Sequence, residues 1–333
     1  MSNPRISCII TAYNEGALAS LSIRSILNQS FTDFELLIVD DGASEDTRAT
    51  LQSFNDARIV HIRQANDGLS SARNRALGLA RGDYICFLDA DDSRPVWAFE
   101  EMIKTAERTQ ADCVFCPGLL SEVRHHITPF YDQTIFEQLS VIGPVDATTD
   151  AQTFLKGVAL AAAIEPQSAN KFLKRSFVEK YRLRFPAGLF FEDIVFHNSI
   201  VINMDSFAIT EAPCFTYFRR YGRPQITGGS STTRFDSISS AANLLELFSH
   251  SRYFQETQIR AIVVASTFKL LEWCNKSVAH NYKWSFRQSL TAMIQGINPR
   301  YLSELKAPYA SDVYAIAPWV EPSLKYAQGL KPS

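Results

Sequence analysis

The sequence predicts an α/β protein with a mostly parallel sheet, helices on both faces of the sheet, and a helical C-terminal region. Apolar runs of strand length alternate with segments of helical periodicity through the first 120 residues or so, an order typical of βαβ units. These runs are apolar at consecutive positions, as in strands covered on both faces. With 333 residues, 46% of them hydrophobic, the chain can bury a large core.

The strands and helices of the N-terminal half are expected in strict alternation. Runs rich in Ile, Val, Leu and Phe, such as ISCIITAY and FELLIVDD, predict strands. Between them, apolar residues recur at helical spacing. In chain order the predicted strands are 6–13, 34–41, 58–64, 84–90 and 112–118, and the helices between them are 17–30, 44–54, 70–80 and 96–108.

From Ser237 onward the pattern is helical, with apolar residues three and four positions apart over 237–254, 257–278 and 282–297. We expect these faces to pack against the rest of the chain. Docking on a membrane surface is the alternative, because aromatic and basic residues mix in this region. They are Trp273, Trp284, Lys269, Lys276, Lys283 and Arg287.

Composition limits the classes of partner and compartment. The net charge of −2 is too small for a broad nucleic-acid or anionic-membrane footprint. No run reaches the ~20 apolar residues that span a bilayer, and the N-terminal residues show no signal-peptide pattern. We therefore expect a cytoplasmic protein, in peripheral contact with the membrane at most, that binds no nucleic acid.

Two of the six cysteines have the spacing of a chelating pair, Cys113 and Cys116. They fall on a predicted strand, where positions three apart point to opposite faces. We therefore favour core packing over a zinc site.

Polar residues follow each of the first four strands, where parallel sheets bind ligands. Ordinary turns and helix caps explain any one of these loops, but three acidic loops at one edge would repel each other without a cation or a hydrogen-bonding ligand. The candidates are Thr11, Tyr13 and Glu15 after the first strand, Asp40 and Asp41 after the second, Asn66 and Arg73 after the third, and Asp89, Asp91 and Asp92 after the fourth.

A divalent cation suits this acidic edge, since Mg²⁺ or Mn²⁺ is often held by one or two carboxylates together with substrate phosphate oxygens. The sequence has neither G-x-G-x-x-G after the first strand nor G-x-x-x-x-G-K-[ST]. The edge therefore predicts a nucleotide diphosphate site in which Mn²⁺ or Mg²⁺ contacts the phosphates.

The motifs TAYNE, VDDGASED, NDGLSSARN and FLDADD, in this order and at these spacings, resemble those of the inverting family 2 glycosyltransferases of the GT-A fold. The resemblance covers residues 5 to about 120 closely, and further blocks match at 170–196 and 217–227. It implies a catalytic domain over 1–230, with nucleotide-sugar binding in 1–120 and the acceptor side with the catalytic base in 121–230. Residues 231–333 would form the helical C-terminal region.

The resemblance also implies roles for the donor-side residues. Asp41, with Asp40 beside it, would bind the base of the nucleotide, and Thr11, Tyr13 and Glu15 would line the same pocket. In the D-x-D element, Asp91 would be the principal metal ligand, and Asp89 would face the ribose or the metal. Asp92 would be a structural neighbour, and a possible cap of the following helix.

An inverting transfer also needs a base for the acceptor hydroxyl. Glu192 and Asp193 precede an apolar helical run, and the resemblance makes Asp193 the base and Glu192 its neighbour that orients it or contacts the acceptor. From the residues alone, Asp193 could equally cap a helix beginning at Ile194. A base at a helix N-terminus would have its ionised form favoured.

The segment TYFRRYGRPQITGGSS joins arginines to glycines and could form a basic loop that closes over a diphosphate, with Arg219 and Arg223 as candidate ligands. A solvated basic turn is the alternative. Some relatives carry a His metal ligand here, whereas this chain offers Tyr217 and arginines.

The expected function is transfer of a sugar, with inversion, from a nucleotide-sugar such as a UDP-sugar to a glycan or lipid-linked hydroxyl in polysaccharide or lipopolysaccharide synthesis. Two alternatives are an aspartyl phosphatase and a non-catalytic nucleotide- or glycan-binding protein that keeps the fold. The position of the acidic cluster after the fourth strand counts against the first. The presence of both Asp91 and Asp193 counts against the second.

Overall fold

The structure is a computed structural model that describes residues 3–122, 126–219, 231–306 and 315–330. Within these residues the main sheet has seven strands in the order β3-β2-β1-β4-β8-β5-β9. They are β1 (Ile6–Ala12), β2 (Phe34–Asp41), β3 (Ile59–Gln64), β4 (Tyr84–Asp89), β5 (Cys113–Phe115), β8 (Lys171–Lys174) and β9 (Phe207–Ile209). A smaller sheet joins β10 (Phe215–Phe218), β6 (Gly118–Glu122) and β7 (His126–Pro129).

The first four strands are parallel, which confirms the predicted sheet. Their register brings the predicted site loops to one edge, because Thr11 pairs with Asp89 and Ala12 pairs with Asp40. β8 runs antiparallel to both β4 and β5, so the sheet is mixed beyond β4. The carboxyl ends of the parallel strands therefore share one rim, as the sequence predicts.

The predicted helices of the N-terminal half are present, with ends that differ by a few residues. They are α1 (Ala19–Leu27), α2 (Glu45–Gln52), α3 (Leu69–Leu77) and α4 (Ala98–Thr109), with a short 3-10 turn η1 (Gly16–Leu18) before the first. Alternate residues of each strand enter different hydrophobic clusters. Ile10 lies in the cluster with α1 and α4, whereas Ile9 lies in the cluster with α3. Helices therefore cover both faces of the sheet.

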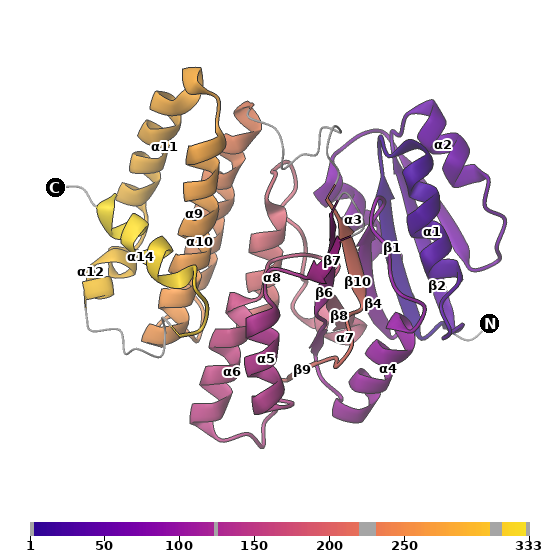
Figure 1. Ribbon diagram of the computed structural model, residues 1–333, viewed down its shortest axis with the longest axis horizontal. Coiled ribbons are helices and arrows are strands. Elements are labelled where there is room, and N and C mark those ends of the chain that lie inside the picture. The colour runs from indigo at the N-terminus through magenta and orange to yellow at the C-terminus, as the bar shows by residue number, and fades with distance from the viewer. Residues whose placement is uncertain (1–2, 123–125, 220–230, 307–314, 331–333) are drawn as a thin grey trace.

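The middle of the chain contains helices that the sequence pattern left unassigned, α5 (Gln133–Ile142) and α6 (Ala151–Ala163). Two more follow, α7 (Arg175–Lys180) and α8 (Glu192–Asn203), and α8 is the helix expected after the Glu192–Asp193 pair. Figure 1 shows α5, α6 and α8 between the sheet and the C-terminal helices.

The C-terminal part is helical, as predicted, and gathers at the end of the molecule opposite α1 and α2 (Figure 1). Its helix α9 packs against α8, and α10 packs against α6 and α14. The elements are η3 (Thr232–Phe235), α9 (Asp236–Ser249), α10 (Thr257–Ser277), η4 (His280–Tyr282), α11 (Lys283–Gly296), α12 (Arg300–Ser303), η5 (Glu304–Lys306) and α14 (Val320–Gly329).

Several groups of the predicted membrane face have partners inside the chain. Lys269 pairs with Glu165, Lys276 pairs with Glu272, and Lys283 donates to the carbonyl of Lys276 at the end of α10. Trp284 is exposed. Among the described residues, no helix combines the length and the apolar character needed to cross a membrane.

All six cysteines are free and buried. Cys113 lies in the cluster on one face of the sheet and Cys116 in the cluster on the other. The two thiols therefore lie in the core on opposite faces of the sheet, as the strand periodicity predicts.

Candidate active site

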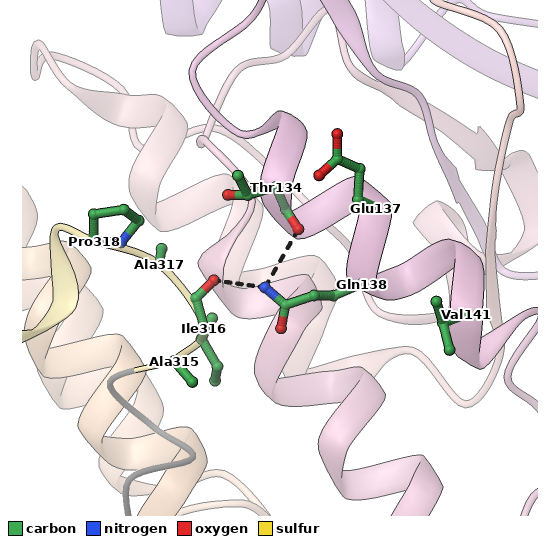
Figure 2. A pocket seen from close by; sticks show the side chains of 8 residues that line it. All are labelled: Thr134, Glu137, Gln138, Val141, Ala315, Ile316, Ala317 and Pro318. Atoms are coloured by element: carbon green, nitrogen blue, oxygen red, sulfur yellow. Dashed lines mark hydrogen bonds between the residues drawn. The ribbon is translucent and has the colours of Figure 1, made fainter.

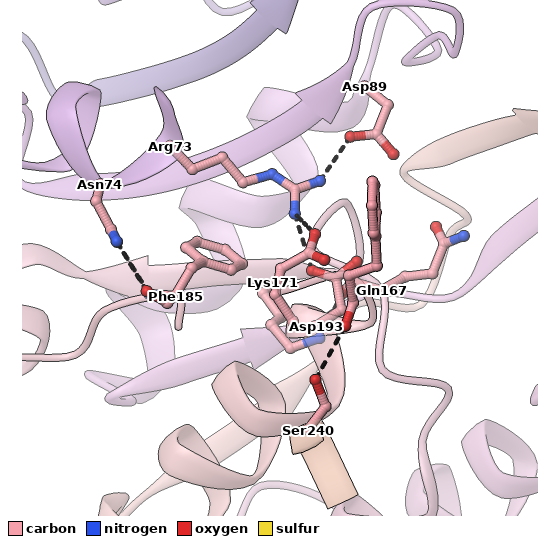
Figure 3. A network of polar contacts seen from close by, with 10 residues as sticks. Arg73, Asn74, Asp89, Gln167, Lys171, Phe185, Asp193 and Ser240 are labelled. Atoms are coloured by element: carbon pink, nitrogen blue, oxygen red, sulfur yellow. Dashed lines mark hydrogen bonds and ion pairs between the residues drawn. The ribbon is translucent and has the colours of Figure 1, made fainter. Parts of the chain in front are cut away.

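A buried arginine joins the carboxylates that follow β4 to those that begin α8. Arg73, on α3, donates from Nη2 to Asp89 Oδ1 at 2.7 Å, and from Nη1 to Glu192 Oε1 at 2.8 Å and Asp193 Oδ1 at 3.0 Å. Only 2% of its side chain is exposed, and its guanidinium lies 4.9 Å from the centre of the Phe185 ring. Figure 3 shows Arg73 reaching between Asp89 and Asp193.

The environment shifts the pKa values of this cluster. Burial and then the charge of Asp193 raise the pKa of Glu192 to about 7. Burial also raises the pKa of Asp193, and Arg73 opposes that shift. Burial by itself would lower the pKa of Arg73, but the charges of the three carboxylates raise that pKa above its ordinary value. Arg73 thus stays charged, while both carboxyls at the start of α8 hold protons more tightly than in water.

This result differs from the expectation that a helix N-terminus favours the ionised form of Asp193. Helix α8 begins at Glu192, and its N-cap residue is Phe191 without a side-chain cap bond. Asp193 therefore lies in the first turn, and its carboxylate faces Arg73 instead of capping a helix that begins at Ile194. The pKa of Asp193 is raised instead, because loss of solvent disfavours the charged form of its carboxyl.

A second buried cation lies next to the cluster. Lys171 on β8 is fully buried, and its ammonium donates to Asn170 Oδ1 at 2.7 Å and to the carbonyl of Gln167. Burial lowers the pKa of Lys171 to about 8, and the charge of Asp193 opposes that shift. Figure 3 places Lys171 beside Asp193. Lys171 was not among the predicted site residues, although a lysine inside the strand KFLK indicates a buried charge with a partner.

The D-x-D carboxylates differ in their surroundings. Asp89 is partly exposed, with 35% of its side chain accessible, and contacts Arg73 through one oxygen. Asp91 is partly buried. Asp92 is fully buried and accepts from the Phe218 amide at 2.9 Å. Asp92 is therefore a structural residue, as expected, and it binds the backbone of β10. It does not cap the following helix, because the N-cap residue of α4 is Trp97.

The two carboxylates at the end of β2 are engaged by neighbouring loops. Asp40 accepts from the Ala43 amide at 2.7 Å and from Arg48 Nε at 2.9 Å. Asp41 accepts from Gln64 Nε2 at 2.8 Å and from the amides of Asp67 and Gly68 at 2.9 and 3.0 Å. Asp41 thus fixes the loop between β3 and α3, which carries Asn66.

The other predicted donor-side residues lie at the same rim. Thr11 is buried at the end of β1, and Tyr13 is exposed. Glu15 accepts from the Tyr13 amide at 2.6 Å, and Asn66 accepts from the Gly68 amide at 3.2 Å. Gly42 brings the two loops together, because a Cβ on it would lie 2.7 Å from the Asn66 nitrogen.

Of the basic loop, the structure describes Arg219, and Arg223 lies outside the described residues. Arg219 pairs with Glu122 at 3.1 Å, and half of its side chain is exposed. It therefore lies at the end of β10, beside β6, with its guanidinium directed to a carboxylate.

A second buried arginine, which was not among the predicted site residues, connects the segments next to the site. Arg94 donates to the carbonyls of Cys214, Phe87 and Ala169 at 2.7, 2.9 and 2.9 Å. It thereby connects β4 to the chain before β8 and before β10. Its signal in the sequence is weak, because an arginine after a strand is usually exposed.

A separate hollow of ≈ 450 Å³ lies between α5 and the segment of residues 315–318. Gln138 crosses it and donates to the carbonyl of Ile316 at 2.9 Å (Figure 2). None of the residues that line it belongs to the Arg73 cluster.

Comparison with known proteins gives consistent results. Residues 7–126 match the family described as "Glycosyl transferase family 2". The chain is 39% identical over 115 residues to the uncharacterized glycosyltransferase EpsJ of Bacillus subtilis, covering 34% of this chain and 33% of that protein. It is 41% identical over 88 residues to an Escherichia coli protein, covering 26% of this chain and 35% of that one. That protein is named UDP-Glc:alpha-D-GlcNAc-diphosphoundecaprenol beta-1,3-glucosyltransferase WfgD.

The chain therefore spans about a third of the length of these two relatives. Among solved structures, S. aureus TarS 1-349 in complex with UDP-GlcNAc superimposes with a TM-score of 0.72 at 16% identity. The superposition covers 98% of this chain and 92% of that one, and at this identity it shows the shared fold.

Proposed function

Because the chain is a family 2 glycosyltransferase with the GT-A fold, we propose that it transfers a sugar from a UDP-sugar to a hydroxyl group of a glycan or lipid-linked acceptor, with inversion at the anomeric carbon. One observation carries the proposal. A single guanidinium, that of Arg73, joins the D-x-D carboxylate Asp89 to the pair Glu192–Asp193. The carboxylates proposed for the donor side and for the acceptor side thus contact the same guanidinium.

Asp193 is the proposed base. Part of its side chain, 29%, is exposed, so the carboxylate can meet an acceptor hydroxyl. Burial raises the pKa of Asp193, which increases its affinity for the proton that it must accept. Arg73 holds one of its oxygens in place.

Glu192 is the proposed positioning partner. It is 5% exposed, so contact with an acceptor is disfavoured, and it shares the Nη1 of Arg73 with Asp193. The pair of carboxylates around one guanidinium fixes the orientation of both. We also propose that residues 1–230 form the catalytic domain and that residues 231–333 form a helical C-terminal region.

The D-x-D carboxylates are the proposed ligands of Mn²⁺ or Mg²⁺. Among the described residues, no three His, Cys, Asp or Glu side chains lie close enough to hold an ion by themselves. Asp89 and Asp91 nevertheless fit a site of two carboxylates completed by phosphate oxygens, because both supply hard oxygen atoms. When bound there, the ion would stabilise the charge of the leaving diphosphate.

The donor nucleotide is proposed to bind over the loops after β1, β2 and β3. Tyr13 offers an exposed aromatic ring at this rim, and the carboxylate of Asp41 orders the neighbouring loop. Uridine is favoured as the base because the name of one relative gives UDP-Glc as its donor and the superimposed TarS structure contains UDP-GlcNAc.

A panel of nucleotide-sugars with Mn²⁺ tests the proposal. Ligands that bind only the folded state raise the melting temperature by mass action, so UDP-sugars should raise it more than GDP- or CMP-sugars. Sugar transfer to glycan and lipid-linked hydroxyls is then measured as the release of UDP. Binding without release on any acceptor would favour the alternative of a non-catalytic nucleotide-binding protein, and no binding would refute the proposal.

A further inference from the structure

The residue directly before the carboxylate pair has a strained backbone. Phe191 has φ 62° and ψ 31°, in the left-handed region. This conformation is strained for a residue with a Cβ, because the Cβ comes too close to the following carbonyl oxygen. Such a conformation persists only where surrounding contacts fix it. Those contacts also set the direction in which Glu192 and Asp193 leave the turn.

The contacts on the Phe191 side chain come from the C-terminal helices. Its ring meets the ring of Trp273 on α10 edge to face, with centres 6.0 Å apart and planes at 88°. The guanidinium of Arg234, a buried residue of η3, lies 3.9 Å from the centre of the Trp273 ring and 5.8 Å from that of Phe191. The three side chains therefore form one contiguous cluster.

The backbone of Phe190 is held by α9. Its amide donates to Asp236 Oδ2 at 3.2 Å, and its carbonyl accepts from Ser240 Oγ at 2.9 Å. Asp236 and Ser240 are four positions apart and hence lie on the same face of α9. Figure 3 shows Ser240 approaching this turn from below the carboxylate cluster.

We propose that Arg234, Asp236, Ser240 and Trp273 form a clamp on Phe190 and Phe191 that positions Asp193 for proton removal from the acceptor. The position of Asp193 then depends on η3, α9 and α10, which begin about 40 residues or more after it in the chain. The clamp acts through the turn, so its members are positioning residues. This inference rests on the proposed role of Asp193.

Two substitutions loosen the clamp at different points. Ser240→Ala removes the bond to the Phe190 carbonyl, and Trp273→Ala removes the aromatic contact. Their controls are Ser249→Ala on the same helix, whose hydroxyl bonds within α9, and Trp284→Ala, which removes an exposed indole. Trp273→Phe keeps an aromatic ring at this position, so its effect should be smaller than that of Trp273→Ala.

Hydrogen–deuterium exchange at residues 190–196 reports the clamp without any turnover. We expect faster exchange in Ser240→Ala and Trp273→Ala, a smaller change in Trp273→Phe, and wild-type exchange in both controls. Unchanged exchange at these residues in the two clamp variants would overturn the inference.

Steady-state kinetics then separate positioning from stability. The kcat of the clamp variants should fall by about 10- to 100-fold, as for a displaced catalytic group, while UDP affinity measured by calorimetry stays at the wild-type value. Faster exchange with unchanged kcat would refute the positioning role. A wild-type protein that transfers no sugar would count against the proposed function, and the exchange data would still decide whether the clamp holds the turn.

Discussion

Arg73 and Asp193 are 120 residues apart in the chain, yet Nη1 of the arginine lies 3.0 Å from Oδ1 of the aspartate. The same guanidinium contacts Asp89 and Glu192. Carboxylates from different segments therefore surround a cation that belongs to the protein itself. The repulsion expected at the acidic rim is relieved in part by this arginine before any metal binds.

Removal of the Arg73 guanidinium should destabilise the fold. Arg73→Ala leaves three carboxylates, one of them buried, without their counter-ion, and we expect a loss of about 3–5 kcal/mol in the free energy of unfolding. The control is Arg75→Ala, an exposed position on the same helix, with an expected change within about 0.5 kcal/mol. Urea denaturation measures both, and equal midpoints for the two variants would contradict the assigned role of Arg73.

Stability should fall with rising pH because of Glu192. Burial raises the pKa of Glu192 from 4.5 to about 7. Between these values the folded protein keeps a proton that the unfolded chain releases, so its stability is highest below the unfolded pKa and is lost as pH rises through the folded pKa. Glu192→Gln cannot ionise, and its free energy of unfolding should decline less than that of the wild type across this window. Urea titrations at about pH 5 and pH 8 measure the difference; parallel declines would show that Glu192 ionises normally.

Asp193→Asn should stop transfer and spare donor binding. The amide cannot accept the acceptor proton, so we expect kcat to fall by at least about 100-fold. Calorimetry with the UDP-sugar should give the wild-type affinity. The control is Asp205→Asn, which changes an exposed aspartate paired with Arg252 and should leave turnover intact. Turnover near the wild-type level in Asp193→Asn would assign the base to another residue.

Asp91→Ala should remove the effect of Mn²⁺ on nucleotide binding. If Asp91 is a ligand of the ion, UDP affinity measured with and without Mn²⁺ should become the same in the variant. Asp33→Ala, at an exposed position before β2, is the matched control and should keep the wild-type difference. A full Mn²⁺ effect in Asp91→Ala would exclude this residue from the metal site.

Gly42→Ala should disturb the donor-side loops. Gly42 has φ +67°, and an added Cβ would lie 2.7 Å from the Asn66 nitrogen. Strain and the forced separation of the loops should cost about 1–3 kcal/mol and weaken UDP binding. Gly78→Ala is the control, because its Cβ would have no contact closer than 3.5 Å. Thermal unfolding and calorimetry on the two variants test this, and equal behaviour would argue against close contact of the loops.

Much of the fold could be predicted because its signals are local. The apolar runs predicted the first four strands, and the polar residues after these strands were expected at one edge of the sheet. The pairing of Thr11 with Asp89 agrees with that expectation. Helices α5 and α6 were not predicted. The partners of Arg73 could not be predicted either. This arginine was expected at the nucleotide site, whereas its described contacts are to carboxylates 16, 119 and 120 residues away.

By itself the sequence determined the alternation of strands and helices, the parallel sheet and the set of polar residues at its rim, since periodicity and turn chemistry depend on neighbours along the chain. Only the tertiary structure decided which charges meet, how burial shifts the pKa values of Glu192 and Asp193, and which helices hold Phe191 in its left-handed conformation. These depend on distances between segments far apart in the chain, and on the loss of solvent when those segments pack together.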